Sequence, residues 1–500
     1  MVHDEPVKEG SEQDGSSNPE AKFSFFVGPG NNSELVRKTL ERRPWWELGK
    51  EDDPDLNLKW LQVRQRSVAE WVRRMGNKQY LNHLDGLTCI GRKNELYFNL
   101  KAYCEKEKIN VHEIAPPTFV ISVGEACPEY VEFCRVCKQL ENKARGQGAS
   151  EKSAKVVKSN EKAGKGEGAT SSDNHSDNLS AASTDEPSSD SASRTASSSK
   201  NASKASLKSP GKSSHSKMSR GDAISNINTA GERNIWIVKP TNNNRGNGIR
   251  VFRGFNDVDA HLKKKQAGSQ VIVQKYIERP LLYKGRKFDI RCLVLVDNNM
   301  SIYVYRRFYL RTSSAMYNPE NVQDLFVHLT NYAVQKKKKK GKPERELDED
   351  EMDEEDEAME EGNNLSMDEL TAFLAEEGYR MDANGILARI QEIVVLVFQA
   401  VWKKLNPLRE KNTFEIFGWD FLLDEEMNVW LIEVNTNPYI GCSSQLLRTI
   451  FTGMLEGAVR KCIDPFFPPP RGRSLDEVEE VDGSDMWDKV YPAEPNKDKK

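Results

Sequence analysis

The stretch Trp430-Leu-Ile-Glu-Val-Asn435, preceded by Phe417-Gly-Trp-Asp-Phe421, decides the fold of this 500-residue chain. Both segments are rich in aromatic and branched residues, and a short polar turn separates them, so they predict a β-hairpin. Side chains alternate faces along a strand, so Glu433 and Asn435 point the same way. Pairing across the hairpin brings Asp420 to that face as well.

This group of polar side chains predicts a metal site. Two carboxylates and an amide oxygen suit a hard cation such as Mg²⁺, which binds one or two carboxylates together with nucleotide phosphates. The alternative is a hairpin whose polar residues simply face water. The apolar neighbours Ile432 and Val434 favour the metal, because a carboxylate buried without a partner is costly.

The amino-acid composition of the chain limits the classes of protein to which it can belong. Hydrophobic residues make up only 37% of the chain and charged residues 30%, with a net charge of −4, so part of the chain is expected to be unfolded. The polar N-terminus is not expected to be a signal peptide, and the apolar run 393–402 is expected to be too short to span a bilayer. Eight scattered cysteines suggest reduced thiols. Cys134 and Cys137, with Cys127 nearby, lack a matching ligand cluster for zinc.

Two low-complexity segments interrupt the folded regions. The first is rich in serine and lysine and has almost no large apolar residue, so it cannot bury a core. The second joins five lysines to an acidic block, Glu344–Glu361, which is expected to be a solvated loop or to compete with an acidic substrate for a basic groove. The predicted organisation is a disordered leader (1–21), an N-terminal α/β unit with the start of a central domain (22–142), a disordered insertion (143–220), a central subdomain (221–278), a C-terminal subdomain (279–467, with the charged loop 336–362) and a polar tail (468–500).

Within this frame, residues 56–120 are interpreted as one small α/β unit. The proline-rich stretch 465–470 is expected to end the fold.

Cationic residues recur at the ends and on one face of the predicted strands. Lys239 follows the strand Trp236–Val238 directly and precedes a loop rich in asparagine and glycine. Lys287 shares a strand face with an aspartate and an arginine, two and four residues further on. These positions also fit a solvated sheet surface. Combined with Arg311 and the acidic hairpin, however, they favour a cationic cleft around a Mg-bound polyphosphate.

Six motifs follow one another along the second half of the chain. They are Trp236-Ile-Val-Lys-Pro240, Gln274-Lys-Tyr-Ile277, Lys287-Phe-Asp-Ile-Arg291, Leu310-Arg-Thr-Ser-Ser314, His328-Leu-Thr-Asn331 and Leu431-Ile-Glu-Val-Asn435. Together and in this order they resemble the catalytic domain of tubulin–tyrosine ligase and its ligase-like relatives. The resemblance covers about residues 234–465 and implies an α+β ATP-grasp fold, in which two subdomains clamp ATP and Mg²⁺.

The resemblance implies a role for each matching position. Residues expected around ATP are Lys239 and Lys275 at the phosphates, Arg245, Gly246 and Gly248 in a phosphate-covering loop, Gln274, Lys275, Tyr276 and Ile277 at the adenine, and Lys287, Asp289, Thr330 and Asn331 completing the site. Residues expected to act on the substrates are Arg291 and Arg311, and those expected to bind Mg²⁺ are Asp420, Glu433 and Asn435, with Glu433 also counted as catalytic.

The implied chemistry is ATP-dependent ligation of a carboxylate to an amine. A carboxylate of the protein substrate attacks the γ-phosphoryl group of ATP, and the amine of a free amino acid then displaces phosphate from the acyl-phosphate. The implied substrate is an acidic tubulin tail or a microtubule, with neither nucleic acid nor membrane as a partner. The implied location is the cytoplasm and cytoskeleton, including a cilium or flagellum.

The choice of amino acid rests on fewer residues. The segment 414–435 most resembles the tyrosine ligase, so tyrosine is expected ahead of glutamate or glycine. Arg307 and Phe308 depart from that enzyme, and Asn435-Thr-Asn-Pro-Tyr439 is more similar to glutamylating or glycylating relatives. An inert tubulin-binding protein and a small-molecule ligase are the other hypotheses. The filled nucleotide and metal positions disfavour the first, and the tubulin-ligase motifs disfavour the second.

Overall fold

The computed structural model describes residues 22–64, 70, 72, 79–142, 233–241, 246–331, 334–335 and 362–491. These residues belong to one compact unit, which comprises Met1–Ala144 and Ala223–Lys500. The predicted leader, the serine-rich insertion, Arg245 and all of the charged loop except Gly362 lie outside the described residues.

Helices and strands are mixed, in agreement with the predicted α+β class. Within the described ranges the strands form three sheets, and the first is a parallel sheet of order β2-β1-β3-β4. β1 of this sheet begins at Phe23, and the helix α1 that follows it begins at Ser33. The elements are β1 (Phe23–Val27), α1 (Ser33–Glu41), β2 (Trp46–Leu48), β3 (Leu58–Trp60) and β4 (Tyr80–Leu81).

The second sheet is antiparallel and joins segments from both sides of the serine-rich insertion. Its order is β5-β8-β6-β7, and β5 pairs with β8 from Thr118 to Ser122. The interpretation of residues 56–120 as one unit is therefore wrong, because β3 and β4 pair with β1 while β5 belongs to this second sheet. The elements are β5 (Thr118–Ser122), β6 (Ile235–Pro240), β7 (Arg250–Arg253), α6 (Gly254–Leu262) and β8 (Gln270–Lys275).

The third sheet is centred on β10 (Arg286–Val296), whose long apolar alternation is buried on both faces. β10 pairs on one edge with β12 and β11 and on the other with β14, all antiparallel. The predicted hairpin β14–β15 is confirmed, and β10 and β11 form a second hairpin. The other strands are β9 (Leu282–Tyr283), β11 (Ile302–Tyr305), β12 (Tyr309–Met316), β13 (Asn364–Ser366), β14 (Glu415–Leu423), β15 (Val429–Asn435) and β16 (Trp487–Tyr491).

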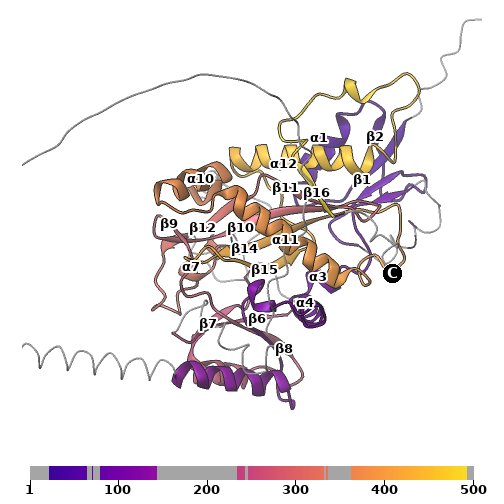
Figure 1. Cartoon of the computed structure of the whole chain (residues 1–500). Coiled ribbons are helices and arrows are strands. Elements are labelled where there is room, and N and C mark those ends of the chain that lie inside the picture. Colours follow the sequence, from indigo (N-terminus) through magenta and orange to yellow (C-terminus); the bar gives the residue numbers. More distant parts are fainter. Residues whose placement is uncertain are drawn as a thin grey trace, which may run out of the picture. The chain divides into compact units, whose positions relative to one another are not determined.

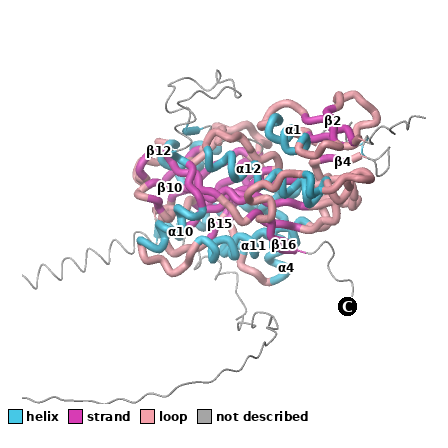
Figure 2. The backbone as a smooth tube through the Cα atoms, turned by 90° about the horizontal axis from the view of Figure 1, so that it is seen from above, coloured by secondary structure: helices cyan, strands magenta, loops and turns pink. Residues whose placement is uncertain are grey.

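Two long helices cover the two faces of this sheet (Figure 1). α11 (Ala383–Val401) packs on the face that carries Ile290 and Val294, whereas α12 (Gln445–Ala458) packs on the face that carries Leu293 and Leu295. α1 lies beside α12 (Figure 2). The other helices are α3 (Thr88–Gly91), α4 (Lys93–Glu107), α7 (Leu325–His328), α10 (Met367–Glu376), the short 3-10 segments Val111–Glu113 and Leu475–Glu477, and the π-helical turn Val459–Ile463.

α11 is, by length and composition, the one described helix that could cross a membrane. In this structure one side of it faces the sheet, and Ile386, Ile390 and Val394 are fully buried there. An apolar helix of this kind is what the core of a large α+β domain requires.

The fold continues beyond the proline-rich stretch, so the prediction that it ends at 465–470 and is followed by a polar tail is wrong. β16 pairs with β11 at the edge of the third sheet, and Trp487 is buried against α12. Trp487 Nε1 donates to Met454 O at 3.2 Å. The strand lies at a sheet edge and is partly exposed to solvent. It can therefore contain the polar residues Asp488 and Lys489, which give the segment a polar composition.

Candidate functional site

The hairpin β14–β15 brings the three predicted metal ligands together. Asp420 lies directly opposite Glu433, and Gly418 lies opposite Asn435. Asn435 Nδ2 is 3.3 Å from Asp420 Oδ2 and 3.4 Å from Glu433 Oε1. The predicted convergence is thus confirmed, whereas metal binding by these residues stays a prediction.

Two arginines hold the carboxylates in place. Arg291 Nε lies 2.5 Å from Asp420 Oδ1, and Arg311 Nη2 lies 3.0 Å from Asp420 Oδ2. Arg311 also forms a bidentate pair with Asp289, at 2.7 and 2.8 Å, and Thr330 Oγ1 donates to the same carboxylate. Burial acts to raise the pKa of Asp420, but the two guanidiniums outweigh it, and the pKa lies below its ordinary value. Asp420 is therefore ionised, and ion pairs connect it through Arg311 to Asp289.

The donor set fits a divalent cation that also binds phosphate. Two carboxylates and one amide oxygen are too few to enclose a metal ion, and the described residues contain no group of three or more His, Cys, Asp and Glu that could do so. Mg²⁺ binds with few protein ligands where substrate phosphates and water supply the rest. Glu433 suits this role, because its side chain is 19% exposed and reaches the cavity described below.

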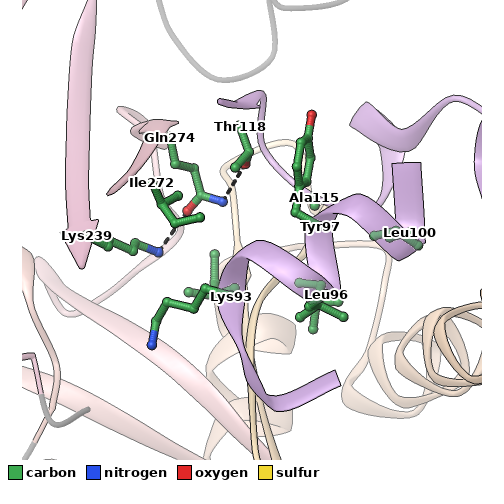
Figure 3. Close-up of a pocket in the computed structure, with 11 residues that line it drawn as sticks. Lys93, Leu96, Tyr97, Leu100, Ala115, Thr118, Lys239, Ile272 and Gln274 are labelled. Carbon is green, nitrogen blue, oxygen red and sulfur yellow. Dashed lines mark hydrogen bonds between the residues drawn. The ribbon is translucent and has the colours of Figure 1, made fainter. Parts of the chain in front are cut away.

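Lys239 lies at the end of β6, with its ammonium in the same cleft. Its Nζ donates to Gln274 Oε1 at 2.8 Å, and Gln274 Nε2 donates in turn to Thr118 Oγ1 at 2.9 Å (Figure 3). This chain of hydrogen bonds fixes the lysine across β6, β8 and β5. Burial lowers the pKa of Lys239 to about 8, although Glu433 acts in the opposite direction.

Lys287 approaches from β10. Its Nζ donates to Tyr276 OH at 3.0 Å and to His328 O at 2.8 Å, and the Tyr276 hydroxyl lies 2.9 Å from His328 Nδ1. Burial lowers the pKa of Lys287 to about 7, with Asp289 opposing and Lys239 reinforcing the shift. A buried lysine whose pKa is lowered this far is typical of a functional site, here one that binds an anion.

The ammonium group of Lys275 does not lie with those of Lys239 and Lys287. Strand alternation places its side chain with Trp236 on the opposite face of the second sheet, where it is 1% exposed. Its Nζ lies 2.5 Å from Glu278 Oε1. The predicted contact between the Lys275 ammonium and phosphate disagrees with this placement, while its backbone remains beside the predicted adenine position.

An open cavity brings most of the predicted residues together. It is lined by both the second and the third sheet, and Gly246 closes one side, where a Cβ at that position would lie 2.7 Å from Val334. Gly248, Arg291, Arg311 and Asn435 do not line it. The predicted residues that line it are Lys239, Gly246, Gln274, Lys275, Tyr276, Ile277, Lys287, Asp289, Thr330, Asn331, Asp420 and Glu433.

Sequence reasoning assigned no role to Lys93. It is the first residue of α4, and its Nζ lies 3.2 Å from Glu433 Oε2. It lines the main cavity and also a smaller, mostly apolar cavity between α4, β8 and β15 (Figure 3). A lysine that opens a helix beside an arginine gives no signal on its own, since surface helices commonly contain such pairs.

Comparison with known proteins identifies the family. The model of the tubulin-tyrosine ligase family matches residues 212–471, just over half of the chain. The chain belongs to this family. Tubulin glycylase 3D of Tetrahymena thermophila is 33% identical over 277 residues, which cover 55% of this chain and 25% of the relative. Tubulin glycylase 3A of Drosophila melanogaster is 35% identical over 238 residues, covering 47% and 22%.

A third relative modifies tubulin differently. The probable tubulin polyglutamylase ttll-9 of Caenorhabditis elegans is 32% identical over 216 residues, which cover 42% of this chain and 48% of the relative. The matched segment thus spans between about a fifth and a half of these relatives. Their names do not support the expectation that tyrosine is preferred; they agree better with the alternative, glycine or glutamate.

Proposed function

We propose that this protein is an ATP-dependent ligase that joins glycine or glutamate to a carboxylate in an acidic tubulin tail. The observation that carries the proposal is the shared cavity, where two lysines with lowered pKa values face the Asp420–Glu433 pair. Under this proposal the second and third sheets act as the two ATP-grasp subdomains. The family match and the names of the relatives support it.

The cavity offers one place for each part of ATP. Ile277, Leu422 and Ile432 form an apolar cluster with Trp430, which suits a purine whose edge hydrogen-bonds to the backbone of residues 274–277. Lys239 and Lys287 would then neutralise the phosphates. Asp420, Glu433 and Asn435 would hold Mg²⁺, which supplies charge neutralisation at the transferred phosphoryl group.

The ligation has two steps. A carboxylate oxygen of the tail attacks the γ-phosphorus and ADP leaves; the amine nitrogen then attacks the acyl carbon, phosphate leaves, and the amide forms with loss of a proton. Arg291 and Arg311 lie immediately behind Asp420, so they would keep it ionised and offset the charge that builds up beside it. Positioning of the reactants in a closed cleft would supply most of the acceleration.

Glycine is our first choice of amino acid, because two of the three relatives described are glycylases. Glutamate is the second, on the match to the polyglutamylase. Catalytic inactivity is disfavoured, because the predicted nucleotide and metal positions within the described residues carry competent side chains. Action on tubulin would take place at the cytoskeleton.

Incubation with tubulin, ATP, Mg²⁺ and labelled glycine, glutamate or tyrosine, each supplied alone, tests the proposal. We expect ATP-dependent label in tubulin with glycine or glutamate. Label only with tyrosine would overturn the choice of amino acid, and no label with any of the three would overturn the ligase assignment for this tail.

A further inference from the structure

Two consecutive asparagines near the N-terminus adopt an unusual backbone conformation. Asn31 has φ 44° and Asn32 has φ 54°, both in the left-handed region. That region is costly for most side chains, and asparagine tolerates it better than other non-glycine residues. Glycine would fit there without cost, so the presence of asparagine points to a use for the amide side chains.

Both amides bind the loop that follows the predicted metal ligands, residues 436–442. Asn31 Nδ2 donates to Asn437 Oδ1 at 2.8 Å and to Pro438 O at 2.9 Å, and the Ile440 N–H donates back to Asn31 Oδ1 at 3.0 Å. Asn32 Nδ2 donates to Ile440 O at 3.0 Å.

A side-chain bridge adds to this connection. Asn437 Nδ2 donates to Gln62 Oε1 at 3.2 Å, and Gln62 Nε2 donates to Gly30 O at 2.8 Å. The segments that follow β1 and β3 therefore hold this loop through the backbone of Pro438 and Ile440 and through the side chain of Asn437.

The loop packs on β14 beside the arginine that binds Asp420. A Cβ at Gly418 would lie 2.7 Å from Pro438 Cβ and 3.3 Å from Arg291 Cδ, so Pro438 rests on β14 beside the arginine that binds Asp420. On the opposite side, a Cβ at Gly91 would lie 2.7 Å from Thr436 Cγ2. The loop has little room to shift without disturbing one of these contacts.

The position of the 436–442 loop along β14 indicates which part of the site lies next to the loop. Leu422, Asp420 and Gly418 share one face, spaced about 7 Å apart. Leu422 and Asp420 line the nucleotide cavity, whereas Gly418 lies beyond Asp420 and is covered by Pro438. With the purine at the Leu422 end and the transferred phosphoryl group at Asp420, the remaining reactants must approach from the Gly418 end.

We propose that Asn31 and Asn32 are positioning residues that hold the 436–442 loop as a wall of the pocket for the incoming amino acid. This inference rests on the proposed ligase function. It assigns to the N-terminal sheet a part in amide formation, separate from ATP binding.

The first test needs no activity. In Asn31→Gly, the left-handed backbone is kept and all three side-chain hydrogen bonds are lost. We expect the Ile440 amide to exchange hydrogen at least about tenfold faster, measured by mass spectrometry on the full chain, because its acceptor is gone. Lys108→Gly is the matched control, since Lys108 also has positive φ (58°) and is exposed at the end of α4. That control should leave the loop unchanged.

The second test is kinetic. In Asn31→Gly and in the Asn31→Gly/Asn32→Gly double variant, we expect amide formation to fall about 10- to 100-fold with a raised KM for the amino acid. The KM for ATP and the thermal midpoint should match those of the control. Unchanged loop exchange, or faster exchange with unchanged amino-acid kinetics, would overturn the positioning role. Equal losses of ATP binding and thermal stability would overturn it too, because they would mark a scaffold role. An inactive wild-type protein would instead refute the ligase assignment.

Discussion

Lys93 Nζ lies 3.2 Å from Glu433 Oε2, so the first residue of α4 neutralises a carboxylate of the β14–β15 hairpin. The same lysine lines the cavity that also contains Lys239 and Lys287. A cation beside a predicted metal ligand can hold the carboxylate in position before Mg²⁺ and ATP bind. The same cation can then pair with a phosphate group of the nucleotide.

We expect Lys93→Met to weaken ATP binding about 10- to 100-fold, because one positive charge near the phosphates is lost while the apolar stem is kept. Titration calorimetry with ATP and Mg²⁺ measures the effect. Lys101→Met on the same helix, which pairs with Glu129 away from the cavity, is the control. Equal affinities for the two variants would remove Lys93 from the nucleotide site.

Glu433→Gln should reduce ligation at least about 100-fold, since the variant loses one of the two carboxylates available to Mg²⁺. The fold should survive, because the side chain is partly exposed and glutamine has nearly the same shape. Label transfer to tubulin and a thermal melt provide the two measurements. Turnover close to that of the unmodified protein would show that Glu433 does not hold the metal ion.

Nucleotide binding should take up protons. The pKa values of Lys239 and Lys287 are lowered to about 8 and about 7, so at about pH 8 both ammoniums are partly deprotonated in the free protein. A bound triphosphate favours their charged forms and raises both pKa values, so affinity should decline as pH rises through this range. Asp289, Asp420, Glu433, Lys93 and His328 also face this cavity. Burial and the nearby Lys287 lower the pKa of His328 to about 4, and two arginines hold the pKa of Asp420 below its ordinary value, so neither group changes its charge above about pH 7.

Calorimetry at about pH 8 in buffers of different ionisation enthalpy gives the number of protons taken up. We expect a positive number that becomes smaller in Lys287→Met. Proton release, or an affinity that improves with pH, would contradict the lowered pKa values.

Stability should depend strongly on Arg43. This guanidinium is fully buried and pairs with Glu456 on α12 at 3.0 Å and with Asp464 at 2.7 Å. Arg43→Met would remove the ion-pair partner of the buried Asp464 and leave Glu456 with Arg460 alone, at a cost of about 3–5 kcal/mol in the free energy of unfolding. Arg37→Met, which removes an exposed pair with Glu34, should leave the free energy of unfolding nearly unchanged, because water screens an exposed ion pair. Chemical denaturation compares the two variants.

Local patterns predicted the β14–β15 hairpin and the convergence of Asp420, Glu433 and Asn435, because strand alternation and a polar turn are properties of a short segment. The side on which Lys275 lies could not be predicted in the same way. Alternation shows that Gln274 and Lys275 face opposite sides, but only the packing of Trp236 and Phe133 shows which side is core. The partnership of Lys93 with Glu433 likewise depends on how α4 packs near β15, which no local pattern contains.

The strand after the proline-rich stretch escaped prediction for a related reason. Trp487–Tyr491 is short and half polar, so its composition resembles a tail, and its role appears only from its pairing with β11.

That strand also has a practical consequence. If the chain were cut after Pro470, the unpaired backbone of β11 would form a bare sheet edge, and the apolar site of Trp487 next to Met454 would be left open to water. Bare edges recruit other chains, so the shortened protein should self-associate, visible as early-eluting material in size-exclusion chromatography. A version that ends just after Tyr491 keeps the edge covered and should elute as the full chain does.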